Sequence, residues 1–400
     1  MAGLKILEGI KVVSFTQHLL GPSGTQVLAD MGADVIKVEA PKGAAERNHA
    51  GLEAFKNGVS LYQIATGRNY RDIVLDLKKE AAREAAFRLV TQADVVIENF
   101  RPGVMEKLGL GYEAVKAVQP DIIYVSCTGY GDDPAVRDLP GQDLIMQAMT
   151  GLADCCGSMD GPPTGIGAAV VDVHGGTLLA VGVVSALYHR LRTGEGQKIS
   201  ITMAQAAMDL QLEGMTYSMN DVPIRRAKYG MADGYSKTPY GLFATSDGYI
   251  ALSISPIADY YEATGHDKRL EPYLDPHAAW EFRGEIQQAF TEIMKEKSTE
   301  EWALQLRKYG IWMQVVNSEV ECLENPIIKA VHATVETEHP RAGKLKLLKH
   351  PVNYGCGEME IRYLAPELGE HTAEILRELG YDQPAIERME SEKAIMTRRE

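Results

Sequence analysis

The sequence predicts an α/β protein, with a mainly parallel sheet in a large domain and a smaller α+β domain. Two observations support this fold class. Short runs rich in β-branched residues alternate with segments of helical spacing over the first half of the chain, and the pattern becomes mixed from about residue 221. At 400 residues, the chain is long enough for two domains with substantial cores.

The first half of the chain carries the alternating pattern. Strands that alternate with helices form a mainly parallel sheet that is covered on both faces. In such sheets, ligands bind beyond the carboxyl ends of the strands, so the loops that follow strands are candidate ligand sites. The predicted strands are 10–15, 34–39, 72–75, 95–97, 122–126 and 199–203, and the predicted helices are 22–31, 79–91, 104–118 and 178–191.

The second half of the chain predicts mixed α+β structure. Thr245-Ser-Asp-Gly-Tyr249 is typical of a hairpin turn between strands at 242–244 and 250–253. Helical segments follow at 280–297 and 299–309, and a second, smaller domain is expected to end near Asn325-Pro326. A final helix is expected at 373–379.

The composition argues against several classes of function. The formal net charge of -14 disfavours a general nucleic-acid binder or a membrane-surface protein, because both need basic patches to meet phosphate. The five cysteines form neither a CxxC pair nor a Cys/His metal spacing, so we expect a reducing cytoplasm and no metal site. The first residues lack a signal-peptide core, and the apolar segment 178–188 is too short to span a bilayer. We therefore expect a soluble cytoplasmic protein.

Asp172 is the candidate catalytic residue. It ends an apolar run, and glycines flank it at Gly165 and Gly175. We expect it just before the first turn of the helix 178–191, where free backbone N–H groups and the helix dipole favour an ionised carboxylate. Two compatible interpretations follow. Asp172 can cap the helix, and a carboxylate that is free of neighbouring side chains can act as a nucleophile towards an electrophilic carbonyl.

Two Gly-containing turns do not predict a nucleotide-phosphate site. The first β-α turn, Gln17-His-Leu-Leu-Gly-Pro-Ser-Gly24, lacks the GxGxxG spacing, so we do not expect NAD. Arg192-Thr-Gly-Glu-Gly-Gln-Lys198 lacks the GxxxxGK[ST] spacing and precedes a strand, so we interpret it as a turn.

Four motifs together resemble the class III coenzyme A transferases, also called the CaiB/BaiF family. This family includes formyl-CoA transferase, carnitine CoA-transferase and α-methylacyl-CoA racemase. The motifs occur in the right order along nearly the whole chain: Gly-Pro-x-x-Thr-Gln-x-Leu-Ala-x-Met-Gly-Ala-Asp-Val-Ile-Lys-Val-Glu at 21–39, Glu98-Asn-Phe-Arg-Pro-Gly103, Thr193-Gly-Glu-Gly-Gln197 and Gly369-Glu-His-Thr372.

The resemblance implies a fold and an assembly that periodicity does not give. It implies a Rossmann-like large domain built from both chain ends, a small domain between them, and a homodimer whose two subunits interlock like linked rings. The expected boundaries are 1–220 for the N-terminal part of the large CoA-binding domain, 221–328 for the small domain, and 329–400 for the part that returns to the large domain.

The resemblance also implies a reaction. Asp172 matches the family nucleophile, whose carboxylate attacks an acyl-CoA donor and passes coenzyme A to a carboxylic acid through a covalent aspartyl intermediate. The substrates are thus a small acyl-CoA and a carboxylate, without a permanently bound cofactor or metal. Arg101 and Lys107 match the basic CoA contacts, and Asn99 and Arg71 match more loosely.

The chain departs from the family pattern at several positions. Tyr70 replaces a basic residue that is common beside Arg71, and Leu19 stands where formyl-CoA transferase has a substrate-contacting Gln. The run of consecutive glycines over the formyl-CoA site is missing, with Gly230 and Gly234 as the nearest candidates. Formate and oxalate are therefore not the expected substrate pair.

Two alternatives to a transferase stay open. The racemase branch needs a second base, a His in a Gly-His-Asp motif, which here reads Gly141-Gln142-Asp143. A neutral amide cannot take up a proton as imidazole does, although His18 or His174 could stand in. Asp143 is either a second acid of the site or the N-cap of a helix at 144–149. The other alternative is an inactive CoA-binding protein, against which the intact Asp172 argues.

Overall fold

The computed structural model describes residues 3–398 and divides the chain into two compact units. Within the described residues, the first unit comprises 3–143, 169–207 and 331–398, and the second comprises 144–168 and 208–330. The expected boundaries at 220/221 and 328/329 need correction, because residues 144–168 and 208–220 cluster with the second unit. The side chain of Gln211 donates to the carbonyl of Thr150 at 3.2 Å, and Arg226 donates to the carbonyl of Gly161 at 2.9 Å, so these segments hold one another.

A seven-stranded sheet forms the centre of the first unit. Six of its strands are parallel and follow the doubly wound order of a Rossmann fold, and the short last strand, β14, pairs antiparallel with β5 at the edge. The predicted parallel sheet is confirmed. In spatial order the strands are β14 (Ile395–Met396), β5 (Tyr70–Leu75), β2 (Asp34–Glu39), β1 (Lys11–Phe15), β6 (Val95–Glu98), β7 (Ile123–Thr128) and β8 (Gln197–Thr202).

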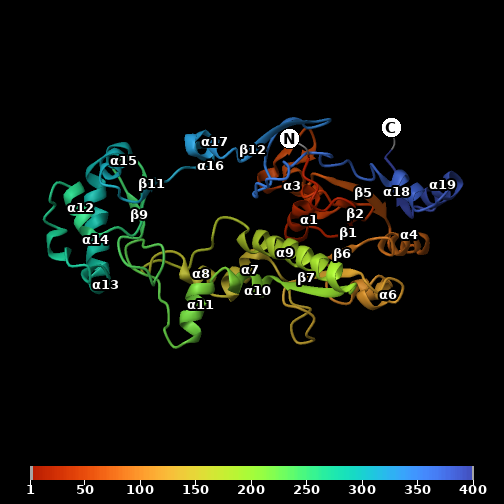
Figure 1. The fold of residues 1–400 in the computed structure, drawn as a ribbon, viewed down its shortest axis with the longest axis horizontal. Helices are drawn as coiled ribbons and strands as arrows, with labels where there is room; N and C mark the ends of the chain where they lie inside the picture. The colour runs from red at the N-terminus through yellow and green to blue at the C-terminus, as the bar shows by residue number, and fades with distance from the viewer. Residues whose placement is uncertain (1–2, 399–400) are drawn as a thin grey trace. The chain divides into compact units, whose positions relative to one another are not determined.

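Helices of the first unit pack on this sheet. The apolar side chains of α4, α5, α6, α18 and α19 form one buried cluster with side chains of the strands, and α4, α18 and α19 lie together beside β5 in Figure 1. The predicted helix 104–118 is in fact two helices, because Gly109 adopts a left-handed φ of 73° directly after α5. The helices are α1 (Leu20–Asp30), α2 (Ala45–Asn48), η1 (Gly51–Glu53), α3 (Leu61–Thr66), α4 (Glu80–Val90), α5 (Val104–Lys107), α6 (Tyr112–Lys116), α9 (Val170–Thr193), α10 (Met203–Asp209), α18 (Thr372–Glu378) and α19 (Gln383–Ser391).

Helix α9 begins eight residues earlier than the apolar pattern predicts, at Val170 instead of Leu178. The glycine pair therefore lies inside the helix, where it allows α1 to approach closely. A Cβ added at Gly176 would lie 2.1 Å from Ser23 Oγ and 2.9 Å from the carbonyl oxygen of Leu20. The glycines thus mark a helix crossing and not a helix start.

The full length of α9 also corrects the expectation that its apolar segment is too short for a membrane. With 24 residues and a mean hydropathy of 1.7 over its most apolar window, α9 is long and apolar enough to cross a bilayer by length and composition. A core helix meets the same two criteria. Because α9 packs closely against α1 and carries Asp172 in its first turn, we interpret it as a helix of the α/β unit.

The remaining strands of the first unit form two small hairpins. They are β3 (Phe55–Lys56) with β4 (Val59–Ser60), and β12 (Thr334–His339) with β13 (Gly343–Leu348). Apolar side chains of β4, α3 and β13 form a small core of their own.

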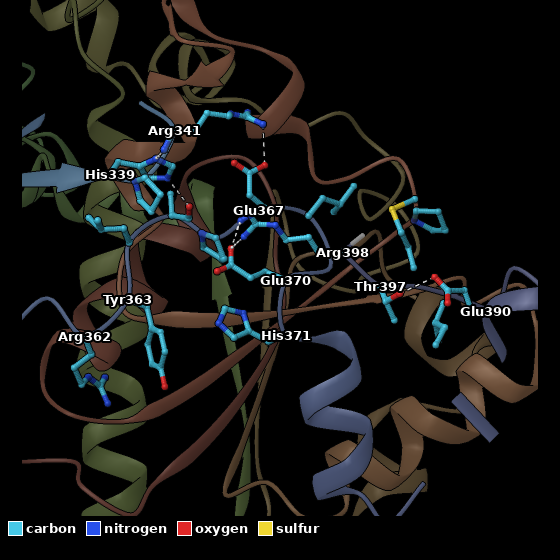
Figure 2. A pocket seen from close by; sticks show the side chains of 18 of the residues that line it. His339, Arg341, Arg362, Tyr363, Glu367, Glu370, His371, Glu390, Thr397 and Arg398 are labelled. Carbon is cyan, nitrogen blue, oxygen red and sulfur yellow. Dashed lines mark hydrogen bonds and ion pairs between the residues drawn. The ribbon is translucent and has the colours of Figure 1, made fainter. Parts of the chain in front are cut away.

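The Gly369-Glu-His-Thr372 motif completes the edge of the sheet at β5. The ring Nδ1 of His371 accepts from the backbone N–H of Asp72 at 3.2 Å, and the hydroxyl of Thr372 accepts from the backbone N–H of Val74 at 3.0 Å. Beside the motif lies a pocket of about 1080 Å³ (Figure 2), with Arg341 paired to Glu367 at 2.9 Å. The motif that carries part of the family resemblance therefore has a structural role here.

The second unit is built around a three-stranded antiparallel sheet. The predicted hairpin is confirmed, and a third strand joins it on the β10 side. Helices α12, α14 and α15 pack on this sheet through a core that includes the buried Trp302, Phe243 and Phe290. The elements are α7 (Asp143–Met149), α8 (Leu152–Cys155), α11 (Leu212–Met219), β9 (Gly241–Ala244), β10 (Tyr249–Leu252), α12 (Ile257–Ala263), η2 (Glu271–Tyr273), α13 (Ala278–Glu281), α14 (Arg283–Ile293), η3 (Met294–Glu296), α15 (Thr299–Lys308), β11 (Met313–Val315), α16 (Glu319–Glu324) and α17 (Pro326–Ala330).

Candidate active site

Asp172 lies in the first turn of α9, the helix that precedes β8. It was expected just before the first turn, at the position that Ala169 occupies, but it is the third residue of the helix. In a doubly wound fold, such a crossover helix starts beyond the carboxyl ends of the parallel strands. The half-buried Asp172 therefore stands at the edge of the sheet where this fold class binds ligands.

Asp143 supplies the cap of α9 that the sequence suggested Asp172 would provide. The Oδ2 atom of Asp143 accepts from the backbone N–H groups of Val171 at 2.8 Å and Asp172 at 3.1 Å. The N-cap residue itself, Ala169, has no side chain that can accept. Because Asp143 binds these free N–H groups, the Asp172 carboxylate is not needed as the cap.

The electrostatic environment of Asp172 is that of a reactive carboxylate. Burial raises the pKa of Asp172 to about 6, and the negative charge of Asp143 contributes to the rise. An acid with a raised pKa is more basic than an exposed carboxylate, yet at neutral pH it is still mostly ionised. The helix start was expected to favour the ionised form of Asp172, whereas burial and the charge of Asp143 raise its pKa.

The first residue of α1, Leu20, lies against the Asp172 face of α9, directly after the loop between β1 and α1. A Cβ added at Gly175 would lie 2.6 Å from Leu20 Cδ1, and Gly175 is on the same side of the helix as Asp172, three residues away. Asn99 fixes this loop from the end of β6. Its side chain accepts from the N–H of Gln17 at 3.0 Å and donates to the carbonyl of Gln17 at 2.7 Å. Asn99, predicted as a loose CoA contact, is thus also a structural clamp at the point where the strand order reverses.

Arg101 lines a charged pocket formed by the end of β6, the loops after β6 and β7, and residues within β7 and β8. The pocket has a volume of about 310 Å³, and its walls include the hydroxyls of Ser126 and Ser200. Its other cations are Arg137 and Lys198, and its carboxylates are Glu98, Glu106 and Asp132. The Nζ of Lys198 lies 3.9 Å from the Asp132 carboxylate.

Glu98 is a carboxylate of this pocket whose charge changes near neutral pH. Burial raises the pKa of Glu98 to about 7, against the hydroxyl of Ser126 and the backbone N–H of Phe100, which stabilise its ionised form. The sequence analysis missed Glu98, Arg137 and Lys198 as site residues. Position is a signal for Glu98, the last residue of β6, and for Arg137, in the loop after β7. It is no signal for Lys198, which lies at the amino end of β8.

Lys107 and Arg71 do not join Arg101 in that pocket. Lys107 is exposed at the end of α5, outside the pocket walls. Arg71 lies in the amino half of β5 and is bound by three carboxylates, those of Asp34 at 2.9 Å, Glu374 at 2.9 Å and Glu378 at 2.7 Å. The role of Arg71 as a CoA contact stays a prediction, and these three ion pairs, which already neutralise its charge, argue against it.

Three residues bear on the second base that a racemase needs. Gln142 is exposed and directly precedes the buried Asp143. His174 is half-buried, two residues after Asp172 on α9, and His18 is exposed in the loop between β1 and α1. The structure thus keeps an amide at the motif position where a racemase needs imidazole.

The fold and the site define a doubly wound α/β protein with a partly buried carboxylate at the ligand-binding edge of its sheet. The chain belongs to CoA-transferase family III, whose description matches residues 7–372. It is 30% identical over 397 residues to the succinyl-CoA:glutarate CoA-transferase of Homo sapiens, over 96% of this chain and 89% of that one. It is 29% identical over 410 residues to the formyl-CoA:oxalate CoA-transferase of Rhodopseudomonas palustris, over 96% of this chain and 95% of that one.

A solved structure supports the same assignment. The crystal structure of a CaiB/BaiF family protein from Brucella suis superposes with a TM-score of 0.82 at 30% sequence identity, over 94% of this chain and 99% of that one. The resemblance found in the sequence motifs is confirmed, and so is the mixed α/β fold with a large, mostly parallel sheet.

Proposed function

We propose that this protein transfers coenzyme A from an acyl-CoA to a carboxylic acid, with Asp172 as the covalent nucleophile. The observation that carries the proposal is the Asp172 carboxylate in the first turn of α9, relieved of helix capping by Asp143 and made more basic by burial. An anionic nucleophile at this edge of the sheet suits attack on a thioester carbonyl carbon.

The reaction balances without a proton donor or a further reactant. The Asp172 carboxylate attacks the thioester carbonyl, the C–S bond breaks, and CoA leaves as thiolate from an acyl-aspartyl anhydride. The thiolate then attacks the Asp172 carbonyl, which releases the donor acid and leaves an aspartyl-CoA thioester. The acceptor carboxylate repeats these two steps in reverse order, so that acyl-CoA forms and the Asp172 carboxylate is regenerated.

The proposed acceptor is a dicarboxylic acid. The human relative is named for succinyl-CoA and glutarate, and succinate and glutarate are both dicarboxylic acids. The acyl-CoA polyphosphate is proposed to bind at the charged pocket with Arg101, while the thioester reaches Asp172. Cations of this pocket supply the positive charge that an otherwise acidic chain needs for such a ligand.

The test is a trapping experiment with a matched control. The protein is incubated with succinyl-CoA, without acceptor, and then with hydroxylamine, and its peptides are identified by mass spectrometry. A hydroxamate at Asp172 is expected, and glutarate added first should abolish it while glutaryl-CoA appears. Asp172→Asn should lose turnover by several orders of magnitude, whereas Asp160→Asn, which changes an exposed aspartate, should not. A hydroxamate on another acid would move the nucleophile, and no exchange with any acid would favour an inactive CoA-binding protein.

We also propose a homodimer. Helix α9 exposes a row of apolar side chains with seven- to eight-residue spacing, in which Val173 is 51%, Val181 58% and Tyr188 60% exposed. A second copy that covers this row would remove a large apolar area from water. Sedimentation at low concentration is the test, because interlocked subunits cannot separate without unfolding, and a folded monomer would contradict the proposal.

A further inference from the structure

A second clamp holds the loop between β1 and α1, next to the one provided by Asn99. The Oε2 atom of Glu46, in α2, accepts a hydrogen bond from the backbone N–H of His18 at 2.9 Å. Asn99 holds the preceding residue, Gln17, through two hydrogen bonds. The loop is therefore fixed from both sides of the point where the strand order reverses, by one side chain after β6 and one after β2.

The clamped residue has an unfavourable backbone conformation. His18 has a φ of 66°, in the left-handed region that residues with a Cβ rarely adopt. Such a conformation is unfavourable and persists only where the surroundings hold it. The hydrogen bond from His18 N–H to Glu46 is the contact that acts directly on this peptide unit.

Glu46 is a buried acceptor that lies against a cation. Its side chain is 1% exposed and pairs with the Nζ of Lys37, whose side chain is 5% exposed. A hydrogen bond to an ionised carboxylate is roughly twice as strong as one between neutral groups. Glu46 thus links Lys37 to the His18 peptide, with one carboxylate oxygen on each.

The clamped loop leads into α1, whose first residue packs on the helix that carries the candidate nucleophile. Leu20, two residues after His18, lies against Gly175 on the Asp172 side of α9. Tyr62 lies near both Asp172 and Glu46. Burial, the charge of Asp172 and the charge of Glu46 together raise the pKa of Tyr62 to about 12. A shift of the loop would therefore change the wall beside Asp172.

We infer that Glu46 is a positioning residue for the transfer reaction, which holds His18 in its left-handed conformation and so fixes the loop beside Asp172. It acts through the His18 peptide and does not touch the reacting atoms. Its loss should lower kcat more than it changes KM for the acyl-CoA, because the charged pocket with Arg101 is a separate wall of the site.

A matched pair of double variants tests this role without leaving a buried charge unpaired. Lys37→Met/Glu46→Met replaces the ion pair by apolar side chains of similar size, a change that folded proteins often tolerate. Lys37→Met/Glu46→Gln removes the same charges but keeps an acceptor for the His18 N–H. The first variant should expose the His18 amide to hydrogen exchange and lower kcat about 10- to 100-fold. The second variant should keep the His18 amide protected from exchange. Its fold-loss of kcat should be less than about a third of that of the first variant.

Rescue by glycine separates a positioning role from a merely structural one. Glycine adopts a positive φ without a Cβ clash, so His18→Gly added to Lys37→Met/Glu46→Met should restore most of the lost kcat, measured relative to His18→Gly alone. A kcat for Lys37→Met/Glu46→Met close to that of the unchanged protein would overturn the inference, and so would a loss that His18→Gly does not restore.

The activity readout rests on the proposed function, whereas the amide readout does not. If the unchanged protein transfers no CoA, the proposed function fails and exchange at His18 alone decides whether Glu46 holds the loop. Equal exchange rates at His18 in the unchanged protein and in Lys37→Met/Glu46→Met would contradict the clamp itself.

Discussion

Asp143 and Asp172 are joined through the backbone at the start of α9, since the Asp143 carboxylate accepts the N–H of Asp172 at 3.1 Å. This contact has two opposite effects on Asp172. It satisfies N–H groups at the helix start, which would otherwise favour an ionised Asp172 side chain as a cap. It also places a second negative charge nearby, which together with burial raises the pKa of Asp172. Burial and the charge of Asp143 thereby make the proposed nucleophile more basic.

The raised pKa predicts that the native Asp172 destabilises the fold at neutral pH. The folded state binds the Asp172 proton more tightly than the unfolded state, because the pKa is about 6 in the fold against a reference value of 3.8. The stability that the protonated acid contributes is present below about pH 4 and is lost as the pH rises through about 6. Asp172→Asn should therefore be more stable by about 2–3 kcal/mol above this range, and equally stable below it.

Urea unfolding of both proteins as a function of pH measures this difference. The pH dependence is the distinguishing feature, since a general packing effect of the amide would be the same at all pH values. A variant that is less stable than the native protein at neutral pH would contradict the assignment of a strained, buried carboxylate at Asp172.

Asp143 should act on Asp172 through charge and on α9 through capping, and two substitutions separate these roles. Asp143→Asn keeps an oxygen that can accept from the N–H groups of Val171 and Asp172 but removes the charge. Its acid limb of kcat against pH should therefore move to lower pH, because the charge of Asp143 contributes to the raised pKa of Asp172. Asp143→Ala should show the same shift and also lose about 1 kcal/mol of stability. An unshifted acid limb in Asp143→Asn would show that Asp143 acts by capping alone.

The sequence predicted the features that follow from a local pattern of residues. The alternation of strand and helix patterns was enough to predict the parallel strands. Asp172 was selected because it is an isolated acid beside glycines. It did not predict that Asp143, 29 residues away in the chain, caps α9, because such a contact depends on tertiary packing. The sequence also did not show that Arg71 is paired. An arginine that contacts a ligand and one that Asp34, Glu374 and Glu378 already neutralise are the same letter in the sequence.

Arg101 and Arg71 should respond to the same substitution in different ways. Arg101→Gln removes an exposed cation of the charged pocket and should raise KM for the acyl-CoA about 3- to 10-fold, with less dependence on salt and little change in stability. Arg71→Gln removes the shared partner of three carboxylates and should lower stability while leaving KM nearly unchanged. Isothermal titration with CoA and thermal unfolding distinguish the two. A larger loss of CoA affinity in Arg71→Gln than in Arg101→Gln would restore the original interpretation of Arg71.

The close crossing of α1 and α9 should tolerate a methyl group at one glycine of α9 and not at another. In Gly176→Ala, the new Cβ would lie 2.1 Å from Ser23 Oγ, 2.9 Å from the carbonyl oxygen of Leu20 and 3.0 Å from the amide nitrogen of Gly24. Two of these atoms belong to the backbone and cannot rotate away, so the helices have to separate. We expect a loss of more than about 2 kcal/mol of stability, together with reduced transfer activity because Asp172 lies one turn away.

Gly182→Ala is the matched control in the same helix. Its Cβ would have Ile199 Cγ2 as the nearest atom at 3.5 Å, an ordinary contact. Since alanine favours a helix interior over glycine by up to about 1 kcal/mol, Gly182→Ala should be neutral or slightly stabilising. Chemical unfolding and the exchange rate of succinyl-CoA with glutarate measure both effects. If Gly176→Ala keeps both stability and activity, the α1–α9 contact does not position the first turn of α9, and the place of Asp172 at the sheet edge has another cause.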